Sequence, residues 1–372
     1  MTTSITGGDW EPYVLGTAPL EEGAAGGAVH RLPAWARAQV DDQLFRFVEA
    51  CPVGGRIRFE TDADEVFLTV AATTVVIDGV EPAVTLVVEQ GEQETEIRLD
   101  APTLLVVAEE QVVEVRPRSP EVVRIPVSGS GPVDIWLPHG ARVELVSLAA
   151  AAPIVAVDAP GLRWTHYGSS ISQGANAVSP VRTWPVAAAR RLGWNLRNLS
   201  LGGNAQLDGF VARVIRDHPA DLITLKVGIN VVNADSMRER TFRPALHSFL
   251  DTIREGQPDT PIVVISAISC PAHEDAAGPT VTGSEGMAHA AVRAVERDVG
   301  ALTLGRTRDV LAEVVTARAD PGLTFWDGRD LLGPAEEGML YDGLHPDQRG
   351  LDLIAARFAD GILARLPMAR SR

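Results

Sequence analysis

The stretch Trp164–Gly174, WTHYGSSISQG, decides the fold of the second half of the chain. A short β-prone run ends abruptly there in small residues, which lie between Gly168 and Gly174. Glycine permits the tight backbone path that lifts a side chain off the end of a strand, and the next regular segment, 182–192, has a helical pattern. The stretch therefore predicts a strand that stops and presents a serine, and Ser170 is the candidate.

Two interpretations of this turn remain open at that point. The Gly-x-Ser-x-Gly elbow of the α/β-hydrolases is absent, because the second residue after Ser170 is Ser172 and not glycine. A turn of small residues without any chemical role is the other interpretation. The partners that follow Ser170 in the chain decide between a nucleophile and a simple turn.

After Gly161, predicted strands and helices alternate, which indicates an α/β fold with a parallel sheet and helices on both faces. We expect a three-layer, flavodoxin-like arrangement, with any ligand site beyond the carboxyl ends of the strands. The predicted strands are Arg163–Tyr167, Asn195–Leu201, Asp221–Val227, Pro261–Ser266 and Leu323–Asp327. The predicted helices are Trp184–Leu192, Leu207–Asp217, Phe242–Glu255, Glu285–Ala317 with a possible break near Gly300 and Gly305, and Gln348–Leu366.

The first half of the chain has short β-prone segments at regular spacing, from about Gly54 to Ala149, with almost no helical period. This pattern predicts an all-β sandwich of jelly-roll type. The spacing of apolar residues over 35–47 fits either a helix or an extended strand. The predicted strands are Arg56–Thr61, Glu65–Val75, Ala83–Val88, Glu94–Leu99, Thr103–Val107, Val112–Val115, Val122–Val127, Val133–Leu137 and Arg142–Ser147.

The length of 372 residues favours two domains. The alanine run 149–152, followed by Pro153, marks the boundary, so we expect a β-sandwich domain at 1–152 and a second domain at 153–372. The start of the chain lacks the basic and apolar regions of a secretory signal, and no apolar run approaches the roughly 18 residues that span a bilayer. We therefore expect a cytoplasmic protein with both cysteines reduced.

The net charge of −16 comes with a single lysine, Lys226. An acidic chain without basic clusters argues against nucleic acid or an anionic membrane as a partner. No Gly-x-x-x-x-Gly-Lys phosphate loop is present, and a lysine Schiff base has only Lys226 available. His273, Glu274 and His289 lack the helical spacing of metal ligands. We expect neither a metal nor a cofactor, and the sequence does not predict the oligomeric state.

Three further motifs follow in the order that a catalytic site requires. The segment 198–204, NLSLGGN, ends the second predicted strand, and 227–230, VGIN, ends the third. Backbone N–H groups of glycine and the amide of Asn230 are candidate donors to an oxyanion, although both segments are also ordinary turns. Near the end, 341–346 reads YDGLHP. Its Asp-x-x-His spacing can place a carboxylate against the imidazole Nδ1–H and leave Nε2 free to accept a serine proton.

Taken together, Gly168-Ser169-Ser170, Gly203, Asn230 and Asp342-x-x-His345 resemble the four blocks of the SGNH hydrolases, also called the GDSL family. The resemblance covers roughly Gly161 to Leu366 and departs from the family at two positions. Ser169 stands in place of aspartate in the first block, and Val231 stands where many members have aspartate in the third. The Gly-Ser-Ser-Ile form resembles a branch that carries an N-terminal β-sandwich domain.

The resemblance implies a Ser170–His345–Asp342 catalytic triad. Ser170 attacks an ester or thioester carbonyl, His345 moves the proton, and Asp342 orients the imidazole. The backbone N–H groups of Ser170 and Gly203 and the side-chain amide of Asn230 form the implied oxyanion hole. The expected partner is thus a small-molecule acyl ester or thioester.

Three hypotheses for function stay open. The first is an esterase, in which water releases the acyl group from Ser170. The second is an acyltransferase that passes the group to a bulky alcohol, similar to enzymes that decorate polyketides such as tetracyclines. The third is a sugar-binding protein with an inactive second domain, and the complete set of five site residues argues against it. The sequence does not separate the first two hypotheses, and hydrolysis is favoured because it is the more common activity.

Overall fold

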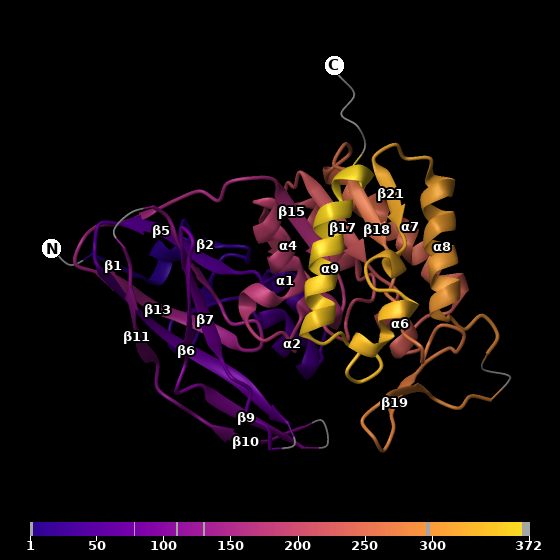
Figure 1. Ribbon diagram of the computed structural model, residues 1–372, viewed down its shortest axis with the longest axis horizontal. Coiled ribbons are helices and arrows are strands. Elements are labelled where there is room, and N and C mark those ends of the chain that lie inside the picture. Colours follow the sequence, from indigo (N-terminus) through magenta and orange to yellow (C-terminus); the bar gives the residue numbers. More distant parts are fainter. Residues whose placement is uncertain (1–2, 78, 109–110, 129–130, 295–297, 367–372) are drawn as a thin grey trace. The chain divides into compact units, whose positions relative to one another are not determined.

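A computed structural model describes residues 3–77, 79–108, 111–128, 131–294 and 298–366 (Figure 1). Backbone contacts group residues 1–160 and 178–181 into one compact unit, and 161–177 and 182–372 into another. The division into domains at 1–152 and 153–372 stays a prediction. Within the described residues, no helix has both the length and the apolar character needed to cross a membrane. Cys51 and Cys270 are buried free thiols.

The second unit contains a five-stranded, fully parallel sheet with the order β16-β15-β17-β18-β21. This order places the first strand between the second and the third, as in flavodoxin-like folds. The predicted parallel α/β sheet is therefore confirmed. The strands are β15 (Arg163–Tyr167), β16 (Asn195–Asn198), β17 (Leu222–Lys226), β18 (Ile262–Ile265) and β21 (Leu323–Trp326).

Helices cover both faces of this sheet (Figure 1). On one face, Trp164 of β15 stacks on Phe358 with ring centroids 4.8 Å apart. On the other face, Tyr167 stacks on Phe249 at 5.4 Å. Because side chains alternate along a strand, one short strand anchors helices on both sides. The longer helices are α4 (Trp184–Leu192), α5 (Gly209–Arg216), α7 (Glu239–Gly256), α8 (Leu304–Arg318) and α9 (Gln348–Gly361).

The predicted helix over 285–317 is wrong over 285–294 and 298–303, and its residues 295–297 lie outside the described residues. Helix α8 begins only at Leu304, after Thr303 accepts a hydrogen bond from the Arg306 N–H. Upstream, β19 (Thr280–Thr282) and β20 (Ala288–Ala290) form an antiparallel hairpin. Its turn contains Gly286, whose φ of +76° lies in the left-handed region that favours glycine. Residues 285–290, the start of the predicted helix, thus belong to a hairpin because strand pairing outweighs the local helical preference.

Short helices complete the second unit. The four-residue α3 (Ser170–Gln173) and the five-residue α6 (Ile229–Asn233) follow β15 and β17 directly, and the sequence pattern did not predict either. The chain also has 3-10 helices at Gly7–Trp10, Pro180–Arg182, Gly328–Asp330, Pro334–Met339 and Leu363–Arg365. Both short α-helices begin at the carboxyl edge of the sheet, where a ligand site is expected.

The first unit consists of two sheets. One has the order β10-β9-β6-β13-β4-β3, with β1 on β13 and β11 on β6, and the other has the order β14-β5-β12-β7-β8, with β2 on β5. Apart from the parallel pair β6–β9, the pairs are antiparallel. The strands are β1 (Thr3–Thr6), β2 (Val14–Leu15), β3 (Glu21–Glu22), β4 (Gly27–Ala28), β5 (Arg56–Thr61), β6 (Glu65–Ile77), β7 (Thr85–Gln90), β8 (Gln93–Arg98), β9 (Thr103–Ala108), β10 (Gln111–Arg116), β11 (Glu121–Pro126), β12 (Val133–Trp136), β13 (Arg142–Ala150) and β14 (Ile154–Ala156).

The two sheets share one apolar core, which makes the first unit a β-sandwich. Leu68 and Leu145 come from one sheet, and Phe59 and Ile135 come from the other. Alternate residues of β6 are buried, as expected for a strand with one face on a core. The ambiguous segment 35–47 is helical at both ends, in α1 (Ala34–Arg37) and α2 (Gln43–Ala50).

Candidate active site

The nucleophile turn directly follows β15, and its geometry requires small residues. A Cβ atom on Gly168 would lie 2.6 Å from Ser172 Oγ, so only glycine fits there. Ser169 is fully buried and accepts a hydrogen bond from the Ile171 N–H at 3.4 Å, which caps α3. Gly174 ends α3 with a φ of +68°. Ser170 is consequently the first residue of a single helical turn at the end of a strand.

Ser170, His345 and Asp342 form a continuous chain of hydrogen bonds. Ser170 Oγ lies 2.9 Å from His345 Nε2, and His345 Nδ1 lies 2.7 Å from Asp342 Oδ2. The side chains of His345 and Asp342 are each about three-quarters buried. With Nδ1–H donating to the carboxylate, Nε2 is left as the acceptor for the serine hydroxyl. The structure thus brings these three predicted residues together.

The turn over 341–346 holds Asp342 in its charged form. Its Oδ1 accepts hydrogen bonds from the backbone N–H groups of Leu344 and His345, at 2.9 and 2.6 Å. Burial alone would raise the pKa of this carboxyl, but the hydrogen bonds from His345 outweigh burial and lower its pKa below the usual range. Asp342 therefore stays ionised and can stabilise a positive charge on the imidazole.

The loop after β16 lies against Ser170. A Cβ atom on Gly202 would lie 3.5 Å from both Cα and Cβ of Ser170. Two side chains hold this loop: Gln173 Oε1 accepts from the Gly202 N–H at 2.7 Å, and Asn204 Nδ2 donates to the Gly202 carbonyl at 2.8 Å. Gly203 follows with a φ of +71°. A Cβ atom at 202 would therefore meet Ser170 at an ordinary van der Waals distance, and it would crowd Gln173 Oε1, which would lie only 2.9 Å away.

The three predicted oxyanion donors have free N–H groups within the described part of the chain. The backbone N–H groups of Ser170 and Gly203 have no acceptor there. Asn230 Oδ1 accepts from the Ala205 N–H at 3.1 Å, which turns the amide so that Nδ2 is left without an acceptor. Three donors at the ends of three neighbouring strands can stabilise the negative charge that develops when a serine attacks a carbonyl.

The sequence analysis missed the side chains that support this site. Gln173 lies three residues after Ser170, and Asn176 Nδ2 donates to the Pro346 carbonyl at 2.6 Å, next to His345. Cys270 Sγ contacts the Gly343 carbonyl at 3.4 Å. Gln173 belongs to the stretch 164–174, and its position one helical turn after Ser170 could have identified it as a supporting residue. Asn176 and Cys270 belong to loops and gave no comparable signal.

His166 and the nearby tryptophans belong to the core under the sheet edge. His166 is fully buried, and its Nδ1 lies 2.6 Å from Thr224 Oγ1. Burial, and then the charge of Lys226, lower its pKa well below the usual value, so the ring is neutral. Trp164 and Trp184 are also fully buried. His166 and these two tryptophans therefore pack in the core.

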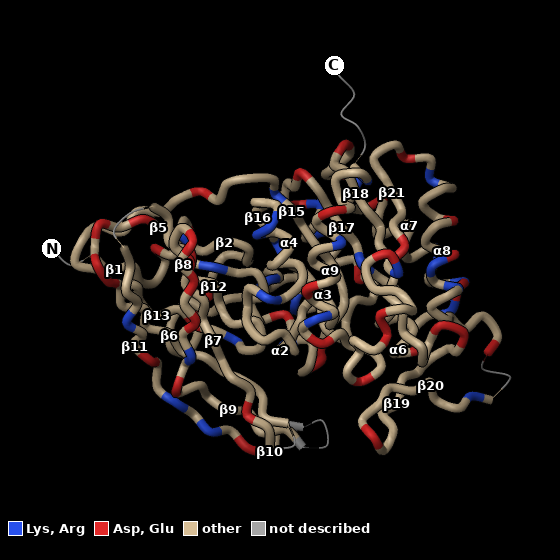
Figure 2. Tube along the Cα trace, viewed as in Figure 1, with Lys and Arg blue, Asp and Glu red and all other residues tan. Residues whose placement is uncertain are grey.

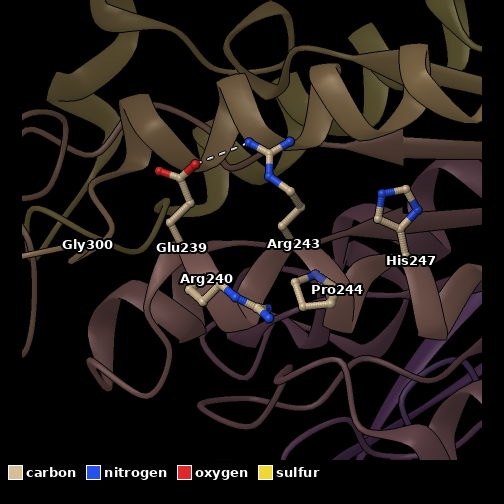
Figure 3. Close-up of a pocket in the computed structure, with 6 residues that line it drawn as sticks. All are labelled: Glu239, Arg240, Arg243, Pro244, His247 and Gly300. Atoms are coloured by element: carbon tan, nitrogen blue, oxygen red, sulfur yellow. Dashed lines mark hydrogen bonds and ion pairs between the residues drawn. The ribbon is translucent and has the colours of Figure 1, made fainter.

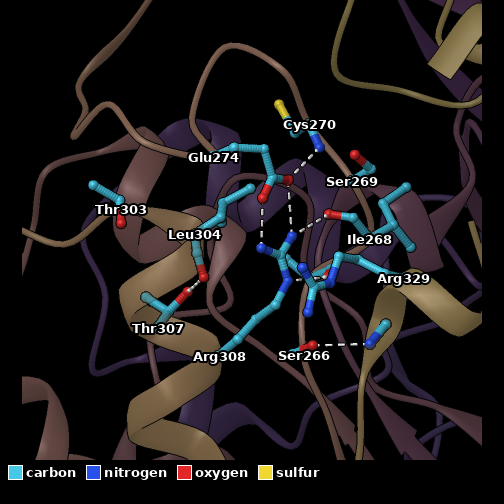
Figure 4. Close-up of polar contacts among 12 residues, drawn as sticks. Ser266, Ile268, Ser269, Cys270, Glu274, Thr303, Leu304, Thr307, Arg308 and Arg329 are labelled. Carbon is cyan, nitrogen blue, oxygen red and sulfur yellow. Dashed lines mark hydrogen bonds and ion pairs between the residues drawn. The ribbon is translucent and has the colours of Figure 1, made fainter. Parts of the chain in front are cut away.

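The side chains of His273 and Glu274 have structural contacts. Figure 4 shows those of Glu274 with Arg308. Glu274 forms an ion pair with Arg308, with its two oxygens 2.6 and 2.9 Å from the guanidinium, and Arg308 also donates to the carbonyls of Ala267 and Ile268. His273 Nε2 lies 2.7 Å from Thr280 Oγ1. Within the described residues, no group of three His, Cys, Asp or Glu side chains is arranged to hold a metal.

A hollow of about 630 Å³ lies elsewhere in the second unit (Figure 3). It is lined by Glu239, Arg240, Arg243, Pro244, His247 and Gly300. Arg243 is paired with Glu239 at 3.2 Å and with Glu313 at 2.5 Å. None of the five predicted site residues lines this hollow, and it has no nucleophile beside a base. This hollow is therefore separate from the candidate active site at the sheet edge.

Comparisons with known proteins bear on the fold and the family. Curated protein sequences give no match. Among solved structures, the salicylyl-acyltransferase SsfX3 from a tetracycline biosynthetic pathway is similar at a TM-score of 0.78, with 23% identity over 98% of this chain and 97% of that one. A putative GDSL-like lipase from Bacteroides ovatus has a TM-score of 0.65, with 20% identity over 98% of both chains. A family two carbohydrate esterase from Cellvibrio japonicus has a TM-score of 0.58, with 12% identity over 98% of both.

These three likenesses are below 25% identity and show the fold of the whole chain. A sequence profile gives the family directly: the profile of the GDSL-like lipase/acylhydrolase family matches residues 166–353, which is half of the chain. The matched segment begins just before the nucleophile turn and ends after His345. The chain belongs to the GDSL-like lipase/acylhydrolase family.

Proposed function

We propose that this protein is a serine esterase that cleaves a small carboxylic ester or thioester through an acyl-enzyme on Ser170. The observation that carries the proposal is the hydrogen-bond chain from Ser170 Oγ through His345 to Asp342. A serine hydroxyl is a weak nucleophile by itself, and an adjacent oriented imidazole is the standard way to activate it.

In the first step, Ser170 Oγ attacks the carbonyl carbon while His345 Nε2 takes the hydroxyl proton. The carbonyl oxygen becomes an oxyanion, which the N–H groups of Ser170 and Gly203 and the amide of Asn230 stabilise. The tetrahedral intermediate collapses, the bond to the leaving group breaks, and His345 gives the proton to the departing oxygen or sulfur. In the second step, water attacks the acyl carbon and loses a proton to His345, the bond from that carbon to Ser170 Oγ breaks, and His345 returns the proton to Ser170 Oγ as the acid leaves.

The test uses 4-nitrophenyl acetate and mass spectrometry of the quenched enzyme. The intact protein should show a burst of 4-nitrophenol and an added acetyl group. Ser170→Ala should abolish both, because no other side chain of the site replaces the hydroxyl. Ser248→Ala is the matched control, since Ser248 is an exposed serine on α7. An acetyl group that persists in Ser170→Ala with full turnover contradicts the proposal.

Acyl transfer to an alcohol is the second candidate. It uses the same acyl-enzyme and differs only in what attacks it. The reason to keep this candidate is the likeness, over both units, to a protein named a salicylyl-acyltransferase. Adding alcohols to the assay above and measuring ester product against free acid separates transfer from hydrolysis.

A further inference from the structure

The proposed chemistry fixes where the alcohol half of the ester lies. His345 Nε2 gives its proton to the departing oxygen, so that oxygen must come within about 2.6–3.2 Å of Nε2. An acceptor alcohol must reach the same position, because it enters by the reverse path. Side chains beside the imidazole therefore contact the alcohol half. This step rests on the proposed function.

Tyr341 is the aromatic side chain beside that imidazole. Its ring lies 6.2 Å from the His345 ring, centroid to centroid, and the planes differ by 24°. The residue is 57% exposed, whereas the aromatic rings that pack under the sheet are fully buried. Its hydroxyl has no hydrogen-bond partner in the described residues. Tyr341 thus presents a flat apolar face and a free donor next to the catalytic base.

Backbone hydrogen bonds fix the turn that carries this ring relative to His345. The Tyr341 N–H donates to the His345 carbonyl at 3.1 Å, and the Ala288 N–H of the β19–β20 hairpin donates to the Asp342 carbonyl at 2.8 Å. Gly343 has a φ of +80°, and its carbonyl contacts Cys270 Sγ. A surface held in place before binding loses little entropy when a ligand packs on it.

The charges around the turn favour a neutral ligand. Asp342 is ionised, and Glu285 lies exposed in the hairpin turn, where Figure 2 shows red segments. Burial, and then the charge of Asp342, raise the pKa of the Tyr341 phenol, which stays neutral and can donate. An alcohol that carries a phosphate or a carboxylate would meet like charge here.

We propose that Tyr341 is the stacking surface for the alcohol half of the ester, and that this half is a neutral alcohol with a flat ring. The ring is aromatic or part of a polycyclic system. The same surface receives the alcohol as leaving group in hydrolysis and as acceptor in transfer. The β19–β20 hairpin supports it by fixing the turn that carries Tyr341.

The experiment compares two acetates with the same acyl group and leaving alcohols of similar acidity, 2-naphthylmethyl acetate and 2-methoxyethyl acetate. The readout is the ratio of their kcat/KM values in the intact protein, Tyr341→Ala, Tyr341→Phe and Leu363→Ala. The proposal expects the ratio to fall about three- to tenfold in Tyr341→Ala, the size of one aromatic contact, and to persist in Tyr341→Phe. Leu363 is a 61% exposed apolar residue beyond α9, about 20 Å along the helix from His345, and its variant should keep the ratio.

Two results would overturn the inference. An unchanged ratio in Tyr341→Ala means that the ring does not contact the alcohol, and an equal loss for both esters means that Tyr341 acts only through the triad. A second arm measures naphthylmethyl against methoxyethyl ester formed from a common acetyl-enzyme, and the same fall is expected. Failure of the proposed function itself is separate, because it appears as unchanged turnover in Ser170→Ala.

Discussion

At the scale of single residues, the nucleophile turn shows how position restricts chemistry. Gly168 has no space for a Cβ atom, and Ser169 is fully buried. Ser169 stands where the family pattern has an aspartate. The shorter hydroxyl of Ser169 bonds the Ile171 N–H and so caps α3. A departure from the family pattern thus still supports the helix that begins with Ser170.

Lys226, the only lysine of the chain, is buried, and the described residues offer its ammonium no hydrogen-bond partner. It is the last residue of β17 and is 1% exposed. Its Nζ has no hydrogen-bond partner in the described residues. Burial, and then the positive charge of Arg308, lower its pKa to about 7. A charged ammonium at this position costs stability, because water solvates it in the unfolded chain and nothing replaces that water here.

The substitution Lys226→Met tests this cost, and its sign depends on pH. Below pH 7 the lysine is charged in the folded and in the unfolded chain, so the folded protein bears the full cost of burying the ammonium. Between about pH 7 and the unfolded pKa, the unfolded chain binds one more proton, so the wild-type free energy of unfolding rises by about 1.4 kcal/mol per pH unit. We expect Lys226→Met to be the more stable protein at pH 6. Its advantage should shrink by about 2–3 kcal/mol at pH 9.

Urea unfolding of both proteins at pH 6, 7, 8 and 9 measures this difference, and other titrating groups cancel in the comparison. A stability difference that stays constant across this range would show that Lys226 does not titrate there. A lower stability of Lys226→Met at pH 6 would show that the ammonium has a partner.

The residues of the site divide into those that a sequence can reveal and those that it cannot. Ser170, Asn230 and His345 follow strand ends or precede a helix, and such positions are visible as changes of pattern. Tyr341 and Asn176 matter because loops distant in the sequence come together around them. Contacts of that kind depend on the three-dimensional path of the chain, which local pattern does not contain.

At the scale of elements, the parallel strands of the second unit were predictable because each is a short β-prone run between segments of helical pattern. The segment 285–303 was not, since its many alanines favour a helix locally. In the structure, Ala288 donates to the Asp342 carbonyl, and residues 280–282 pair with 288–290. These tertiary contacts outweigh a preference of a few tenths of a kcal/mol per residue.

The loop after β16 yields a prediction about α3. Gln173 is the last residue of α3, and its Oε1 holds the Gly202 N–H at 2.7 Å, next to the proposed donor Gly203. Gln173→Ala removes this acceptor, so the loop gains freedom and the Gly203 N–H loses its alignment. Oxyanion donors act in the transition state, so we expect kcat and kcat/KM to fall together, by about tenfold, with KM nearly constant.

Steady-state kinetics on 4-nitrophenyl acetate, together with thermal unfolding, measure this effect. A fall in kcat/KM through a higher KM alone would assign Gln173 to substrate binding. Unchanged kinetics would show that the loop keeps its place without the Gln173 side chain.

At the scale of the whole molecule, length and the change of pattern near residue 150 predicted two architectures, and the structure has a β-sandwich unit and a parallel α/β unit. The jelly-roll type of the sandwich stays a prediction, and such patterns do not contain the acyl chain or the acceptor. Sheet order in a sandwich is set by which strands meet in space, and substrate choice is set by loop side chains.

The net charge of −16 produces the last prediction, which concerns the approach of substrates. Arginines and carboxylates alternate along much of the chain, yet acidic residues exceed basic ones by 49 to 33 (Figure 2). The resulting negative potential repels anionic esters and attracts cationic ones, and salt screens it over about 10 Å at 0.1 M. Between 10 and 300 mM NaCl, we expect kcat/KM to rise about two- to fivefold for a succinate monoester and to fall for a choline ester. The neutral ethyl ester of the same acid is the control and should change little. If the anionic ester is turned over no faster at high salt, a local positive charge near Ser170 must offset the net charge of the molecule.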